Sequence, residues 1–278
     1  MPSIPDPSFA GAVVVLFESR LAAETAAMVR RFGGTPVTAP ALAEVEVDAD
    51  AGIGALIDRL ASPAGSIVVF LTGVAVTRLF AAAERAGRAD ALAGGLRRAV
   101  TVARGPKPAG ALGRRGVTPT HAVAEPFTTD SVIDALARIE VDGRDVTLVH
   151  YGERNEPILA HLSDRGARVH ELLLYEWRLP EDTAPLSDAV DRIAGGQADV
   201  AVFTSQIQVR HLLDVAGPSR RGALVEAMNG RVLVGAVGPT CAAACRDAGI
   251  ADVVTPASPK LAPLITALAT AYAARRAR

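Results

Sequence analysis

Short apolar runs alternate with amphipathic segments along most of the chain. The runs AVVVLF at 12–17, IVVF at 67–70 and VAVF at 200–203 are rich in β-branched residues and uninterrupted, as in parallel strands that are buried on both faces. Each run is followed by apolar residues at helical spacing, and Gly33 with Gly34 ends the first such helix. The alternation predicts an α/β protein with parallel sheets that are covered by helices on both sides.

The same pattern places the other elements. Further strands are expected in AVTVA at 99–103, near 121–124 and in VTLVHYG at 146–152, with extended segments at 35–47 and 167–180. Helices are expected at 21–32, 53–61, 74–87, 128–139 and 156–166, and in a segment that closes at Gly116. Thr129 or Asp130 is the expected cap of the helix at 128–139.

The pattern occurs twice. IVVFLTGVAVTRLF at 67–80 corresponds to VAVFTSQIQVRHLL at 200–213, with Val69/Val202 and Phe70/Phe203 among the matches. At the same offset ARGPKPAGALGRRGV corresponds to AVGPTCAAACRDAGI, and IDRLA to VDRIA. Such self-similarity indicates a tandem duplication, and two copies of an α/β unit predict two lobes with a cleft between them.

Charge and composition exclude several classes of function. The net charge of -1 gives no reason to expect nucleic acid or an anionic membrane as a partner. Lys107 and Lys260 are the only lysines among 29 basic residues, and the arginine forks would suit an acidic ligand, although a bias of the genome explains them equally well. Cys241 and Cys245 lack a nearby His or acidic cluster, so no metal is expected. Without a signal peptide or a spanning run, a cytoplasmic location is expected.

Candidate binding residues lie where strands meet helices. Thr204 and Ser205 follow the strand at 200–203, so their hydroxyls either cap the next helix or bind a ligand. The turn Gly238-Pro239-Thr240 and its duplicate Gly105-Pro106-Lys107 have a glycine that lets a ligand approach the backbone and a proline suited to the first helical position. The two turns predict paired anion sites.

Catalytic motifs are otherwise absent from the sequence. It contains no GxGxxG or P-loop in place, no HExxH and no GxSxG. Tyr175, in LLLYEWRLP, is the notable remaining donor, and from the residues alone it is either a phenol that faces a cleft or a half-buried packing tyrosine. An enzyme with this inventory would shape its substrate more than it would use strong acid, base or metal chemistry.

Four features in this order resemble the uroporphyrinogen-III synthase family. They are a first strand followed by Arg20, a helix and Gly33; FTS at 203–205 followed by VRHLL; VGPT at 237–240 followed by CRDAG; and the Tyr175 segment that ends in Pro180. The resemblance covers Val13 to about Ala269. It rests on the order and spacing of the features, since none is diagnostic alone.

The resemblance implies two flavodoxin-like parallel-sheet lobes joined by a two-stranded extended hinge. Residues 1–37 would pack with 182–278, and 46–171 would form the other lobe, with hinges at 38–45 and 172–181. A cut at the duplication, near residue 143, would divide the chain differently.

The family's reaction cyclises hydroxymethylbilane to uroporphyrinogen III, with loss of water and inversion of the last ring, and without a cofactor. The implied ligand is a linear tetrapyrrole with eight carboxylates, and a monomer is expected. Tyr175, at the family's tyrosine position, would give a proton to the leaving hydroxyl. The residues implied to bind substrate are Arg20, Thr72, Arg104, Gly105, Lys107, Thr204, Ser205, Gly238 and Thr240; Thr204 and Ser205 would hold carboxylates and break no bonds.

Some positions depart from the family's pattern. Gln206 replaces a frequent proline, Cys241 a frequent threonine, and FESR at 17–20 a more usual VTRP. These departures leave two alternatives open: a non-catalytic regulator that binds a tetrapyrrole, and a generic two-lobed binder of acidic metabolites. A screen in which a small diacid, and no tetrapyrrole, raises the melting temperature would favour the last.

Overall fold

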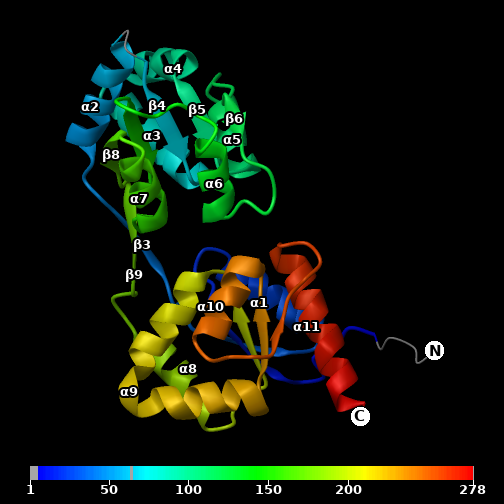
Figure 1. Ribbon diagram of the computed structural model, residues 1–278. Helices are drawn as coiled ribbons and strands as arrows, with labels where there is room; N and C mark the ends of the chain where they lie inside the picture. Colours follow the sequence, from blue (N-terminus) through cyan, green and yellow to red (C-terminus); the bar gives the residue numbers. More distant parts are fainter. Residues whose placement is uncertain (1–5, 63–64, 278) are drawn as a thin grey trace. The chain divides into compact units, whose positions relative to one another are not determined.

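The computed structural model describes residues 6–62 and 65–277, and the chain forms two compact units (Figure 1). Unit 1 contains the residues up to Ala43 and those from Arg178 onward, and unit 2 is Glu44–Trp177. Each unit is built on its own five-stranded sheet.

The sheet of unit 1 is parallel throughout. Its order is β12-β11-β10-β1-β2, and every neighbouring pair is parallel. The strands are β1 (Val13–Leu16), β2 (Thr35–Thr38), β10 (Val200–Phe203), β11 (Leu233–Ala236) and β12 (Val253–Val254). In chain order this is the 2-1-3-4-5 arrangement of flavodoxin-like sheets.

Helices cover both faces of this sheet because its strands alternate between two apolar clusters. Val15 and Phe17 pack with α8, α9 and α10, whereas Val14 and Leu16 pack with α1 and α11. The helices are α1 (Ala22–Arg31), α8 (Ala184–Ala194), α9 (Gln206–Gly230), α10 (Pro239–Asp247) and α11 (Leu261–Arg276). Helix α9 is kinked at Gly217, where φ is 62° and Pro218 follows.

The sheet of unit 2 has the order β6-β5-β4-β7-β8, also parallel throughout. Its strands are β4 (Ile67–Phe70), β5 (Val100–Ala103), β6 (His121–Ala122), β7 (Asp145–Val149) and β8 (Arg168–Leu172). One face carries α2 (Asp50–Ala61), α3 (Gly73–Arg85), α4 (Ala89–Arg98) and α5 (Pro106–Gly113); the other carries α6 (Thr129–Leu136) and α7 (Glu156–Asp164). The predicted fold class, with two parallel-sheet α/β lobes, is confirmed.

The two halves of the duplication exchange strands. The first strand of the chain, β1, pairs with β10 from the second half and carries β2 on its other side. Likewise β7 of the second half pairs with β4 of the first and carries β8 on its other side. The chain changes units between Ala43 and Glu44 and again between Trp177 and Arg178, within the segments expected to be hinges. There β3 (Ala43–Glu46) and β9 (Tyr175–Arg178) form a two-stranded sheet. The hinge role and the cleft stay predictions.

Three local predictions are wrong. Helix α2 begins at Asp50, not at 53, and α4 was not expected, although Leu92 and Leu96 lie four residues apart and are both buried. The cap of α6 is Thr128, whose Oγ1 accepts a 3.3 Å hydrogen bond from the Ser131 N–H, and not Thr129 or Asp130. Among the described residues, no helix is long and apolar enough to cross a membrane.

Gly235 on β11 tests the packing of α11 on the sheet. A Cβ built at Gly235 would lie 2.5 Å from Leu268 Cδ1, so Gly235→Ala is expected to lower the free energy of unfolding by about 1–3 kcal/mol through overpacking. Gly222→Ala, in α9, is the control because no atom lies within 4 Å of its added Cβ, and it should be neutral or stabilising by up to about 1 kcal/mol. Urea unfolding measures both, and equal effects would contradict the packing.

Candidate functional site

The carboxyl ends of the central strands of unit 2 bring several predicted site residues to one edge. Because β4, β5 and β7 are parallel, the chain leaves all three at the same side, at Thr72, Arg104 and His150 respectively. Ligands of open α/β sheets bind at this edge, where helices on opposite faces begin.

Thr72 and Tyr175 meet at this edge. Thr72 is the N-cap of α3, where its Oγ1 accepts a 3.1 Å hydrogen bond from the Ala75 N–H, and the same oxygen lies 3.2 Å from the Tyr175 hydroxyl. The guanidinium of Arg78 lies 5.0 Å from the centre of the Tyr175 ring, a cation–π contact. Tyr175 is only 1% exposed and belongs to an apolar cluster of unit 2, so it packs as one of the two alternatives has it, but more deeply than half-buried.

Arg104 is partly buried beside two phenols. Its guanidinium lies 5.2 Å from the centre of the Tyr151 ring. Burial lowers the pKa of Arg104, and the nearby hydroxyls of Tyr151 and Tyr175 act in the opposite direction. Within the described residues, no carboxylate forms an ion pair with Arg104. A desolvated guanidinium without an acidic partner is suited to receive a carboxylate from a ligand.

The Gly105 turn serves chain packing. A Cβ on Gly105 would lie 2.9 Å from the Phe127 ring, so the glycine makes room for a side chain of the same unit. Lys107, in the first turn of α5, is exposed, and its carbonyl oxygen would lie 2.8 Å from a Cβ on Gly73. The starts of α3 and α5 are therefore in close contact.

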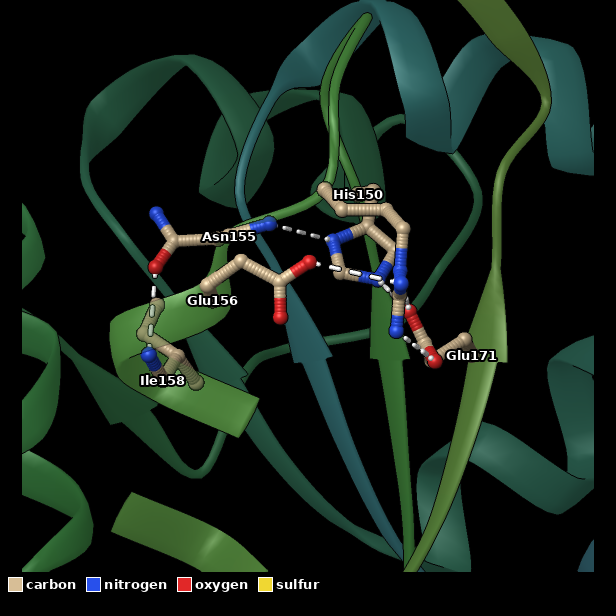
Figure 2. Close-up of polar contacts among 6 residues, drawn as sticks. His150, Asn155, Glu156, Ile158 and Glu171 are labelled. Carbon is tan, nitrogen blue, oxygen red and sulfur yellow. Dashed lines mark hydrogen bonds and ion pairs between the residues drawn. The ribbon is translucent and has the colours of Figure 1, made fainter. Parts of the chain in front are cut away.

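A buried histidine fixes the loop that follows β7, as Figure 2 shows. His150 is fully buried; its Nδ1 accepts a 3.3 Å hydrogen bond from the Asn155 N–H, so the proton of the neutral ring is on Nε2, which faces Glu171 Oε2 at 3.0 Å. Arg154 holds the same carboxylate through two bonds of 2.6 and 2.7 Å. Burial lowers the pKa of His150, although Glu171 opposes the shift.

The corresponding edge of unit 1 is occupied by its own side chains. The Thr204 hydroxyl donates to Glu18 Oε2, and Glu18 Oε1 accepts a 3.1 Å bond from the Arg20 N–H. Gln208 completes the start of α9, because its Oε1 accepts a 2.7 Å bond from the Thr204 N–H and its Nε2 donates to Thr204 Oγ1 at 3.0 Å. Ser205 is the N-cap residue but makes no side-chain capping bond, so capping by the predicted hydroxyls does not occur.

The second Gly-Pro turn resembles the first. Gly238 is buried, and a Cβ there would lie 3.1 Å from Pro259 Cβ, so this glycine also makes room for the chain itself. Thr240 is exposed in the first turn of α10. Cys241 and Cys245 are buried, and no group of three or more metal-ligating side chains occurs in the part of the chain that the structure describes.

The structure therefore brings together Thr72, Arg104 and Tyr175 in unit 2. In unit 1 the backbone N–H of Arg20 and the hydroxyl of Thr204 bond to the same carboxylate, that of Glu18. Sequence reasoning missed the contributions of Tyr151 and Asn155. A signal for Tyr151 was present, because it follows the apolar run of β7 just as Thr72 follows β4.

Comparisons with known proteins match the chain to one family. A family model described as uroporphyrinogen-III synthase HemD matches residues 23–266. An uncharacterized protein of Bacillus subtilis, YjjA, is 29% identical over 268 residues, which cover 94% of this chain and 96% of that protein.

Solved structures of uroporphyrinogen III synthase from Thermus thermophilus are also similar. The wild-type enzyme is 27% identical with a TM-score of 0.62, and the match covers 96% of this chain and all of that chain. A mutant of the enzyme is 25% identical with a TM-score of 0.72, covering 96% and 98%.

Acid is expected to destabilise the protein through His150. Because burial lowers the pKa of the folded imidazole, the unfolded chain binds a proton that the folded chain resists, and the free energy of unfolding falls as the pH drops below about 6.5. The slope for one proton is at most about 1.4 kcal/mol per pH unit. His150→Gln should flatten this dependence in urea unfolding between about pH 7.5 and 5.5.

His121→Gln, at an exposed position of β6, is the control and should retain the wild-type slope. If His150→Gln also retains it, the neutral imidazole does not support the fold in the way the hydrogen bonds indicate.

Proposed function

The chain belongs to the uroporphyrinogen-III synthase family, and on that premise we propose that it converts hydroxymethylbilane to uroporphyrinogen III. The observation that carries the proposal is the buried pairing of the Tyr175 hydroxyl with Thr72 Oγ1, 3.2 Å apart, at an edge where Arg104 has no acidic partner among the described residues. A proton donor and a carboxylate receptor then lie near each other in unit 2.

The proposed reaction begins with loss of the substrate's hydroxyl. Thr72 Oγ1 already accepts from the Ala75 N–H and lies within hydrogen-bonding distance of the Tyr175 hydroxyl, which would give its proton to the substrate once the substrate is bound. Transfer of that proton to the hydroxymethyl oxygen releases water and leaves an azafulvenium cation on the bilane. Since Tyr175 is 1% exposed, the residues that cover it must move before substrate reaches it.

Ring closure needs positioning more than strong acid or base catalysis. The substituted carbon of the terminal pyrrole attacks the cation, rearrangement through a spiro intermediate inverts that ring, and a proton finally lost from carbon restores the phenol. Arg104 and Lys107 of unit 2, and Arg20, Thr204, Ser205 and Thr240 of unit 1, would bind the acetate and propionate groups. Gly105 and Gly238 would act through the shape of their turns, since Phe127 and Pro259 fill the space beside them.

One alternative is a tetrapyrrole binder without turnover. Glu18 accepts the hydrogen bond of Thr204, so in either function Thr204 would have to exchange Glu18 for a carboxylate of the ligand. Purified protein supplied with freshly generated hydroxymethylbilane distinguishes the two functions: the synthase yields the type III isomer, whereas a binder leaves only the spontaneous type I isomer.

Tyr175→Phe tests the proton donor. The substitution keeps the ring beneath Arg78 and removes only the hydroxyl, so type III formation should slow by about 10²-fold or more while the melting temperature changes little. Tyr272→Phe, in α11 of unit 1, is a matched control that should keep the wild-type rate. Unchanged turnover by Tyr175→Phe would assign the proton to another group.

A further inference from the structure

Tyr151 links Arg104 to the end of β9. The phenol comes two residues after β7, is 8% exposed, and its ring contacts two side chains from elsewhere in unit 2. The Arg104 guanidinium lies 5.2 Å from the ring centre, and the Trp177 ring lies 5.2 Å away, centre to centre. Trp177 in turn packs on Gly152, where a Cβ would lie 2.2 Å from the indole.

The orientation of the Tyr151 ring is fixed through Asn155. Asn155 Nδ2 donates a 3.2 Å hydrogen bond to the Tyr151 hydroxyl and a 3.0 Å bond to Thr129 Oγ1. Asn155 Oδ1 accepts a 3.2 Å bond from the Ile158 N–H at the start of α7, and the Asn155 N–H bonds to His150 (Figure 2). With every polar group of its side chain engaged, this 3% exposed residue cannot turn without breaking several bonds.

The orientation of Arg104 depends on the Tyr151 ring more than the orientation of an ion-paired arginine would. In the described part of unit 2 no carboxylate fixes the direction of its guanidinium, so the Tyr151 ring is the contact that orients it. A cation over an aromatic face is stabilised by the ring quadrupole, and more strongly where water is excluded. The Tyr151 ring stabilises the Arg104 guanidinium without neutralising its positive charge, so the guanidinium keeps its attraction for an incoming carboxylate.

We propose that Tyr151 is a positioning residue that holds Arg104 ready to bind a carboxylate of a polycarboxylated tetrapyrrole. The inference rests on the proposed function for the class of ligand, but not for turnover. The ring does the positioning; its packing against Trp177 holds it in place, and the bond from Asn155 to the hydroxyl adds to that packing. Tyr151 acts through Arg104 and makes no bond to the reacting atoms.

Binding of uroporphyrin I, a stable porphyrin with eight carboxylates, tests the proposal without turnover. Trp177 is the single tryptophan of the chain, so quenching of its fluorescence during a titration gives the Kd from the midpoint. Tyr151→Leu should weaken binding about tenfold, Tyr151→Phe should stay within about threefold of wild type because it keeps the ring, and Tyr272→Leu in unit 1 should have no effect.

A double-mutant cycle separates positioning from general packing. If Tyr151 acts through Arg104, adding Tyr151→Leu to Arg104→Gln should cause little further loss of affinity. With hydroxymethylbilane as substrate, Tyr151→Leu should raise KM and leave kcat within about twofold. Thermal melts show whether each variant folds. If Tyr151→Leu does not fold, the test uses Tyr151→Phe, which should keep its affinity for uroporphyrin I whereas Arg104→Gln should lose affinity.

Three results would overturn the inference: no saturable binding of uroporphyrin I by the wild type, equal affinities of Tyr151→Leu and the wild type, or equal losses caused by Tyr151→Leu with and without Arg104. The isomer assay is independent of all three. If only the type I isomer forms while the Tyr151 variants show the expected affinities for uroporphyrin I, the proposed enzyme is wrong and the positioning role stands. If the type III isomer forms while Tyr151→Leu binds uroporphyrin I as tightly as the wild type, the enzyme stands and the positioning role is wrong.

Discussion

The structure depends on the burial of short parallel strands on both faces. Strands such as VVVL, IVVF and VAVF place alternate residues in two separate apolar clusters, so helices must cover both sides of each sheet. Parallel strands also release the chain at one edge, where unpaired N–H groups of new helices meet polar side chains. The stacking of Phe17 on Phe203, with ring centres 4.6 Å apart, places Glu18 beside Thr204 in unit 1.

In the two units, different side chains meet the N–H groups at the carboxyl edge of the sheet. In unit 1 the Glu18 carboxylate accepts a hydrogen bond from the Thr204 hydroxyl, and the Gln208 side-chain amide accepts one from the Thr204 N–H. In unit 2 Thr72 caps α3 and meets Tyr175, while Arg104 rests on an aromatic ring and has no acid beside it in the described residues. The duplication therefore gave two similar sheets with different side chains at their edges, and the proposed proton donor belongs to unit 2.

The sequence was sufficient to predict the architecture, whereas the site that it indicates stays a proposal. Uninterrupted β-branched runs marked the strands, and the repeat at 67–80 and 200–213 marked the duplication. Contacts between distant residues could not be predicted: Thr204 meets Glu18 across 186 positions, and Tyr175 is buried by packing that no local pattern records. The packing role of the Gly-Pro turns could not be predicted, because a glycine that admits a ligand and one that admits Phe127 or Pro259 look the same in the sequence.

The exchange of strands also sets the order in which the two units can be completed during synthesis. All of unit 2 has been translated once Trp177 is made, whereas β1 must wait for β10, since Val14 pairs with Val200. At the usual rates of translation that wait is roughly 10 to 40 s. During it the apolar strands at the start of the chain lack their central neighbour, so a nascent chain with one finished unit still carries an open edge that is prone to aggregation.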